Sequence, residues 1–160
     1  MENPNHNTET TPPEKPPTSE IKTISFSSGD KYRGEFKDNT IEGKGELVFA
    51  DGNKYSGDWK NNAFDGEGEF TWINGDKYIG GWKNGKKSGH GIFKYADGDV
   101  FDGNWSNDMK EGEGTLTYNN GTIFKGNWKE DKREGKGTFS NAVFDVEYIN
   151  GNIVKMKLMK

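Results

Sequence analysis

Hydrophobic and polar residues alternate along most of this chain, and the alternating segments recur every 23 residues. An alternation with a period of two predicts β-strands, because successive side chains of a strand point to opposite faces of a sheet. In residues 52–74, for example, Tyr55, Gly57 and Trp59 fall on one predicted face, with polar residues between them. A fixed period of this length indicates a repeat architecture, which outweighs any inference from composition.

Five gapless copies of one template cover residues 29–51, 52–74, 75–97, 98–120 and 121–143. The template is a glycine, an aromatic residue, a second glycine and a second aromatic residue, followed by a Gly-x-Gly pair. The first aromatic position holds Tyr32, Tyr55, Tyr78, Phe101 and Phe124. The second aromatic position holds Phe36, Trp59, Trp82, Trp105 and Trp128.

Two connections per copy are predicted from the turn residues. Asp51-Gly52 and the matching Asp-Gly or Asn-Gly dipeptides of the other copies predict tight hairpin turns, since these residues tolerate positive φ. The polar segment between Trp59 and Gly66 predicts a second, longer connection. Each copy is therefore expected to form one β-hairpin, and successive hairpins are expected to pair into one antiparallel sheet.

The glycines inside the predicted strands need a reason, because glycine normally weakens a strand. A sheet of one layer has no second layer to cover its apolar face. If alternate positions on the neighbouring strand are glycine, aromatic rings can lie flat across the backbone, an arrangement that rescues strand glycines. We expect a thin core of about two aromatic rings per hairpin, each able to bury about 150–250 Å².

The two ends of the chain depart from the template. Residues 1–20 are rich in Asn, Thr, Pro and Glu and almost devoid of apolar residues, which predicts a disordered tail. Residues 21–28 match the second half of a copy and are expected to form a half repeat. Residues 144–160 carry bulky residues where glycine would be expected, alternating with lysines, and are interpreted as a C-terminal cap. A short helix is the alternative for this cap.

The sequence therefore predicts an all-β fold, an elongated single-layer antiparallel sheet of stacked 23-residue hairpins spanning residues 21–160. The 160-residue chain has a net charge of −4, and most of this charge lies in the tail, so the repeat body is nearly neutral. It contains no cysteine and no apolar run long enough to span a membrane. The first residues do not match a secretory signal, and none is expected.

No active site is predicted. The two histidines, His6 and His90, have no repeated partner and no spacing typical of metal ligands. Asp97-Gly98-Asp99 lacks the glycine and the glutamate that a calcium loop requires, and a hairpin turn explains it better. The Gly-x-Gly pairs lack the strand-to-helix setting of a phosphate-binding loop. We expect no catalytic residues, no metal and no cofactor.

The motif G-x-x-Y-x-G-x-W followed by G-x-G on a 23-residue period resembles the MORN (membrane occupation and recognition nexus) repeat. The resemblance covers residues 29–143 fully and 21–160 with the degenerate ends. It implies a twisted, groove-shaped β-sheet and a non-catalytic role in assembling complexes at membranes, the cytoskeleton, or ciliary and flagellar structures. One difference is that only Gly85 supplies the turn glycine after the second aromatic residue, and Asn or Asp near that position is expected to preserve the turn in the other copies.

The aromatic face is the surface on which a function is expected, because exposed aromatic patches usually bind partners. The predicted partner-binding residues are Tyr55, Trp59, Tyr78, Trp82, Phe101, Trp105, Phe124 and Trp128. Each ring could equally be core alone, so both interpretations stay open at this point.

The favoured hypothesis is a scaffold that docks an extended peptide or a helix of another protein along this face, in the cytoplasm and on the cytoskeleton, in a ciliary or flagellar axonemal assembly. The alternatives are a peripheral membrane tether that binds anionic lipid such as phosphoinositide, and a regulatory subunit of an enzyme. No nucleic-acid partner is expected, and homodimer formation is left open.

Overall fold

The structure is a computed structural model that describes residues 19–140 and 144–158. These residues form strands and turns, and the described part of the chain contains no helix. The strands are β1 (Glu20–Ser25), β2 (Lys31–Lys37), β3 (Thr40–Val48), β4 (Lys54–Lys60), β5 (Ala63–Thr71), β6 (Lys77–Lys83), β7 (Lys86–Lys94), β8 (Val100–Ser106), β9 (Met109–Thr117), β10 (Ile123–Lys129), β11 (Lys132–Phe139), β12 (Phe144–Ile149) and β13 (Asn152–Leu158).

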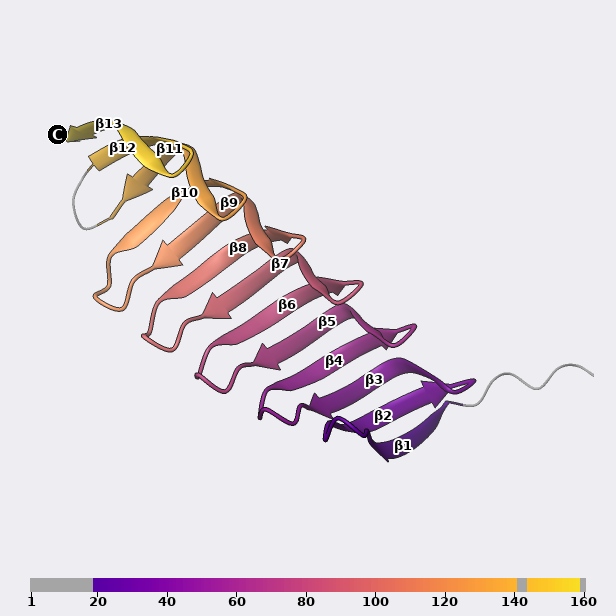
Figure 1. The fold of residues 1–160 in the computed structure, drawn as a ribbon. Helices are drawn as coiled ribbons and strands as arrows, with labels where there is room; N and C mark the ends of the chain where they lie inside the picture. The colour runs from indigo at the N-terminus through magenta and orange to yellow at the C-terminus, as the bar shows by residue number, and fades with distance from the viewer. Residues whose placement is uncertain (1–18, 141–143, 159–160) are drawn as a thin grey trace, which may run out of the picture.

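All thirteen strands belong to one antiparallel sheet, in which each strand pairs with the strands before and after it in the chain. The hairpins therefore follow one another along an elongated ribbon, from β1 at one end to β13 at the other (Figure 1). This confirms the predicted all-β, single-layer fold. The predicted tail lies almost wholly outside the described residues, and the sheet begins at Glu20.

The packing of rings on glycine is confirmed. Tyr55 is fully buried, and its ring lies over the cross-strand pair Gly57 and Gly68. A Cβ atom added at Gly68 would lie 2.7 Å from two ring carbons of Tyr55, a distance that no side chain can adopt without moving the ring. The first aromatic residue of every other copy covers its own glycine pair in the same way. The backbone of the sheet thus forms the floor of the core, and the first aromatic rings lie directly on it.

The two glycines of each Gly-x-Gly pair have different roles. The second one, such as Gly68, lies under the ring. The first one, Gly66, has a φ of +118° and lies where the register between β4 and β5 shifts after Gly57. A left-handed backbone at a bulge favours glycine, and bulges bend a strand and increase its twist. Every template copy carries such a register shift between its two strands.

The prediction for the two connections was wrong in one respect. The tight two-residue turn lies between the strands of one hairpin, as at Asn61-Asn62, where both residues have positive φ. Asp51-Gly52 belongs to the longer connection from β3 to β4, and only Gly52 of the pair has positive φ. Asn and Asp tolerate the left-handed region, so the prediction that the tight turn survives without glycine is confirmed.

The C-terminal segment 144–158 is a hairpin of β12 and β13. The predicted cap is therefore formed by strands, and the alternative of a short helix was wrong for these residues. Val146 occupies the position of a template glycine, and Tyr148 occupies that of the second aromatic residue. Both are buried, and the Tyr148 ring meets Phe124 edge-on at 5.6 Å. Val154 and Met156 on β13 stay more than half exposed. Strand β12 therefore covers the last rings of the core, and β13 forms the edge of the sheet with exposed apolar side chains.

Candidate protein-binding face

The eight predicted partner-binding residues lie together on one face of the sheet, and all are buried, with exposed fractions of 0–6%. They form part of a continuous zigzag in which each first aromatic ring meets the second aromatic ring of its own copy and of the next copy edge-on. Tyr55, for example, lies 5.3 Å from Trp59 and 5.5 Å from Trp82, between ring centroids. We call this zigzag the ring ladder; it runs through Phe36, Tyr32, Trp59, Tyr55, Trp82, Tyr78, Trp105, Phe101, Trp128, Phe124 and Tyr148.

Most polar atoms of the ring ladder are hydrogen-bonded to the backbone, whereas the buried indole N–H of Trp128 has no partner among the described residues. The Trp82 indole N–H donates to the carbonyl oxygen of Gly68 at 3.2 Å, and the Tyr78 hydroxyl donates to that of Gly81 at 2.9 Å. Burial raises the pKa of the Tyr32 hydroxyl to about 12, and nearby Glu35 adds to the shift. The ring ladder is thus a buried core, and a partner cannot touch most of its atoms. A direct contact role for the eight residues stays a prediction.

A second set of side chains lies over the ring ladder and changes in character along the sheet. We call it the cover row; it consists of Ile41, Phe64, Lys87, Lys110 and Arg133, spaced 23 residues apart. Ile41 is buried, and Phe64 stacks on Tyr55 with ring centroids 3.7 Å apart. The next three members are cations above the equivalent rings. The cover row is therefore apolar in the first two copies and positively charged in the last three.

Each cation of the cover row lies in a cage of aromatic rings. The Lys87 ammonium is 4.4 Å from the Trp105 ring centroid, 5.1 Å from Phe93 and 5.7 Å from both Trp72 and Tyr78. Ring faces attract cations, most strongly where water is excluded. The surrounding rings therefore restrict the conformations of these side chains, in contrast to those of fully solvated surface lysines.

The Lys110 ammonium and the Arg133 guanidinium repeat this arrangement one and two copies further on. Lys110 lies within 6 Å of four rings, of which Trp128 is the nearest at 5.2 Å. Arg133 lies 4.5 Å from the Phe124 centroid and donates hydrogen bonds to the hydroxyls of Tyr118 and Tyr148. The last three copies thus present three caged cations in a line.

These cations are partly desolvated and lack a close counter-ion. Burial lowers the pKa of the Lys87 and Lys110 ammonium groups; the negative charges of Asp108 and Asp131 partly oppose this effect at Lys87, and that of Asp131 opposes it at Lys110. Within residues 19–140 and 144–158, no carboxylate lies within 4 Å of Lys87, Lys110 or Arg133. A positive charge that has lost water without gaining an ion pair is a costly arrangement, and an incoming anion would relieve it.

The backbone of the cover row is fixed by the tight turn of the next copy. The Lys87 N–H donates to the side chain of Asp108 at 2.9 Å, and the Asp108 N–H donates back to the Lys87 carbonyl at 3.1 Å. Lys110 and Asp131 form the same two bonds. At the opposite edge of the sheet, Asp76 accepts from the N–H of Ala96 at 2.8 Å. Neighbouring hairpins are thus tied together at both edges, which keeps the cages in register.

The accessible aromatic surface lies beside the cover row. We call it the outer row; it consists of Phe49, Trp72, Tyr95 and Tyr118, which are half-buried and again spaced by 23 residues. Trp72 packs on Phe70 and Phe93, with ring centroids 4.5 and 5.2 Å apart, and keeps part of its surface exposed. The surface that a partner can touch on this face is therefore the cover row and the outer row, with the ring ladder as the support beneath them.

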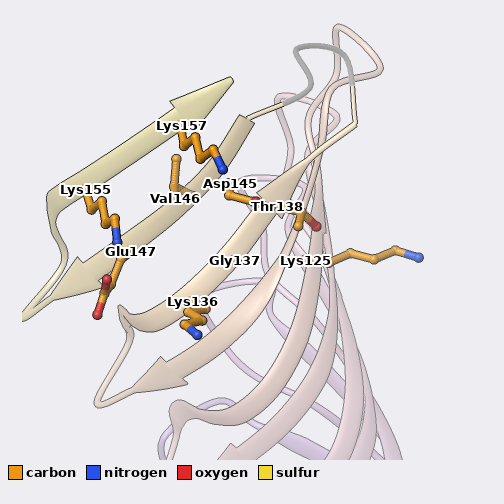
Figure 2. A pocket seen from close by; sticks show the side chains of 9 residues that line it. All are labelled: Lys125, Lys136, Gly137, Thr138, Asp145, Val146, Glu147, Lys155 and Lys157. Carbon is orange, nitrogen blue, oxygen red and sulfur yellow. The ribbon is translucent and has the colours of Figure 1, made fainter. Parts of the chain in front are cut away.

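The opposite, polar face has a hollow at its C-terminal end, with a volume of about 500 Å³. Lysines of β10, β11 and β13 are among the residues that line it (Figure 2). Figure 2 also shows Lys155 beside Glu147 and Lys157 beside Asp145, which are direct cross-strand partners. Opposite charges on paired strands attract one another, so part of the positive charge of this hollow is compensated.

The described residues offer little further chemistry. The described residues contain no group of three or more His, Cys, Asp or Glu side chains arranged to hold a metal ion. His90 lies exposed on the polar face, 2.8 Å from Asp102. In the part of the chain that the structure describes, we found no helix long and apolar enough to cross a membrane.

Comparison with family models settles the classification of the fold. The model of the MORN repeat matches residues 32–54, 55–77, 78–100, 101–123 and 124–142. The chain belongs to the MORN repeat family. The matched segments have the 23-residue period predicted above, displaced by three residues from the predicted copy boundaries.

A search of curated proteins finds no match to this MORN repeat protein. Among solved structures it is similar to the SAS-4 (dCPAP) TCP domain of Drosophila melanogaster, solved in complex with a proline-rich motif of Ana2 (dSTIL). The identity is 12%, the TM-score is 0.41, and the match covers 93% of this chain and 99% of the other.

Proposed function

We propose that this MORN repeat protein is a non-catalytic scaffold that docks a segment of another protein along its aromatic face. The open face of the single-layer sheet carries this proposal. Its ring ladder is complete without a partner, yet the outer row stays partly exposed, and Trp and Tyr side chains are enriched among the anchors of protein interfaces. The fixed backbone of the cover row lowers the entropic cost of binding, because little of this surface must be ordered on contact.

The proposed occupant is an extended or helical segment that lies along the ribbon and contacts several hairpins. The proposed setting is the cytoplasm and cytoskeleton, in a ciliary or flagellar assembly; this setting rests on the family alone. Proximity labelling in the native cell tests it, with the chain fused to a labelling enzyme. Enrichment of axonemal and cytoskeletal proteins is the expected result, and enrichment of unrelated compartments would refute the setting.

A pull-down with variants of the outer row tests the docking itself. Trp72→Ala combined with Tyr95→Ala removes two half-buried rings and is expected to weaken partner capture by about 10- to 100-fold. Ile79→Ala is the matched control, because Ile79 is exposed on the polar face. Equal capture by both variants would contradict the proposal. Trp82 and Trp105 are unsuitable targets, since both are core residues and their loss would destabilise the sheet itself.

Anionic lipid is a second candidate partner, and the lysines around the C-terminal hollow favour it. Clustered basic charge attracts anionic membranes at about 1 kcal/mol per residue near the surface. The cross-strand carboxylates Asp145 and Glu147 reduce this attraction, which places the tether second. Salt-sensitive sedimentation with anionic liposomes that is lost on Lys155→Gln and Lys157→Gln would establish it. No sedimentation at low salt would exclude it.

Self-association through β13 stays a further prediction. The strand is an edge of the sheet, and Ile153, Val154 and Met156 are each about half exposed. Edge strands pair readily unless they are blocked, and the lysines of β13 act against such pairing. Sedimentation equilibrium of the full chain distinguishes a monomer from a dimer directly.

A further inference from the structure

We infer that the C-terminal half of the aromatic face binds an acidic, proline-rich segment whose carboxylates recur at every third residue. This inference rests on the proposed function and specifies the chemistry of its partner. The observations that carry it are the three caged cations of the cover row, their spacing along the ribbon and the aromatic rings beside them.

The charge of the occupant follows from the cages. The positively charged groups of Lys87, Lys110 and Arg133 are partly desolvated, and none has a carboxylate within 4 Å among the described residues. Each is held by surrounding rings, so the three charges stand at fixed positions. A fixed, partly dry cation gains more from an added carboxylate than a solvated surface lysine does. An acidic segment is therefore favoured over a basic or neutral one.

The spacing of its acidic residues follows from the sheet. Neighbouring members of the cover row are separated by two strands, and strands lie about 4.8 Å apart, so the cations recur at about 9.6 Å along the ribbon. A polyproline II helix has three residues per turn and rises about 3.1 Å per residue, which returns a side chain to the same face every 9.3 Å or so. An extended strand does not match, because residues three apart point to opposite sides.

The proline content follows from the outer row. Trp72, Tyr95 and Tyr118 flank the three cages in the same order, and each packs within 6 Å of the cation beside it. Proline-rich segments dock on aromatic grooves because their backbone is already extended and loses little entropy on binding. The face thus offers one carboxylate site and one aromatic platform per copy, which corresponds to one turn of a polyproline II helix.

Fluorescence anisotropy with a synthetic peptide tests the inference on the full chain. The labelled probe consists of four Glu-Pro-Pro units, and the comparison peptide has the same composition with its glutamates together at one end. The repeating peptide is expected to bind about 10-fold more tightly than its isomer, because only it can place carboxylates on all three cations. Equal affinity would assign the binding to general charge attraction and overturn the inference.

Protein variants identify the cations. Lys87→Met, Lys110→Met and Arg133→Met together are expected to weaken the repeating peptide by about 10-fold or more, whereas Lys83→Met, Lys86→Met and Lys132→Met remove the same charge from exposed positions and are expected to leave the preference for the repeating peptide intact. An equal loss in both triple variants would overturn the inference. Replacing Glu by Gln in the peptide gives an independent readout on the unaltered protein, which holds even if a variant folds poorly.

Two further binding experiments test for a different occupant of this face. A helical peptide with glutamate at every seventh residue spans about 10.5 Å per repeat, and tighter binding of this peptide would overturn the polyproline assignment. Binding of phosphatidylserine vesicles that depends on the same three cations would assign the face to lipid instead. If the outer-row variant loses partner capture while the triple cation variant keeps it, the scaffold function stands and the acidic segment is refuted.

Discussion

A single methyl group at Gly114 tests the packing of rings on bare backbone. An ideal Cβ at this position would lie 2.5 Å from Cζ and 2.6 Å from Cε2 of Phe101, far inside the optimal carbon–carbon separation of about 3.5–4.0 Å. Phe101 has no exposed surface, and Trp105 and Trp128 hold it edge-on from both sides at 5.4 and 5.2 Å. Because the ring has no room to move, we expect Gly114→Ala to cost about 3 kcal/mol, the upper end of typical overpacking.

Backbone propensity alone predicts the opposite sign. The φ of Gly114 lies outside the left-handed region, so replacing this glycine by alanine would otherwise stabilise the protein by about 0.4–1 kcal/mol through the unfolded chain. Urea unfolding followed by tryptophan fluorescence measures the difference. Gly114→Ala with wild-type stability or better would refute ring-on-glycine packing.

Two further variants separate the causes of the expected loss. Gly121→Ala places a Cβ in open space at a φ of +82°, where only the left-handed backbone costs about 1–2 kcal/mol. In a Phe101→Leu background the ring is absent, so the added cost of Gly114→Ala is expected to fall well below its wild-type value. An unchanged cost in that background would show that the ring is not the obstacle.

Three other predictions concern stability. Gly85→Asn is expected to stabilise the chain by about 1 kcal/mol. In the equivalent turn the Asn62 side chain accepts a hydrogen bond from the Ile41 N–H at 2.8 Å, and glycine has no side chain to form such a bond. An unchanged urea midpoint would contradict this prediction. Lys110→Met is expected to raise the thermal midpoint at pH 7, because burial lowers the pKa of the Lys110 ammonium and its charged form therefore destabilises the fold. This gain should shrink as pH rises toward 10, since the folded wild type loses the Lys110 proton at a lower pH than the unfolded chain does. Burial raises the pKa of Tyr95 to about 12, so folding free energy is expected to be lost above pH 10 with late tyrosinate absorbance at 295 nm; ordinary tyrosine titration in the folded state would refute this.

The repeat architecture could be predicted from the sequence because its determinants are local and periodic. A ring such as Tyr78 and the glycine beneath it, Gly91, recur at fixed positions in every copy, and their steric relation holds whatever surrounds them. The antiparallel pairing of the strands and their order in the sheet could be predicted from the same period. For the C-terminal cap the sequence left strand and helix both open, because Val146 breaks the glycine pattern.

The turns and the cover row show what the sequence did not reveal. Asp51-Gly52 has the composition of a tight turn, but it lies in a longer connection, in which the Phe49 N–H donates to the Asn53 carbonyl and the Gly52 N–H donates to the Phe49 carbonyl. The immediate sequence of Lys87 does not distinguish it from a surface lysine, because nothing there shows that Trp72 and Trp105 come together around its ammonium group. The one available signal was its alignment with Phe64, a position where an earlier copy places a ring.

The proposed docking face is tested most directly by site-specific photo-crosslinking in the native cell. A photoreactive phenylalanine derivative replaces Tyr95 in the outer row, and in a second chain it replaces Ile79 on the polar face. We expect discrete adducts with a partner protein from position 95 and none from position 79. Adducts from position 79 with none from position 95 would show that the partner binds the other face.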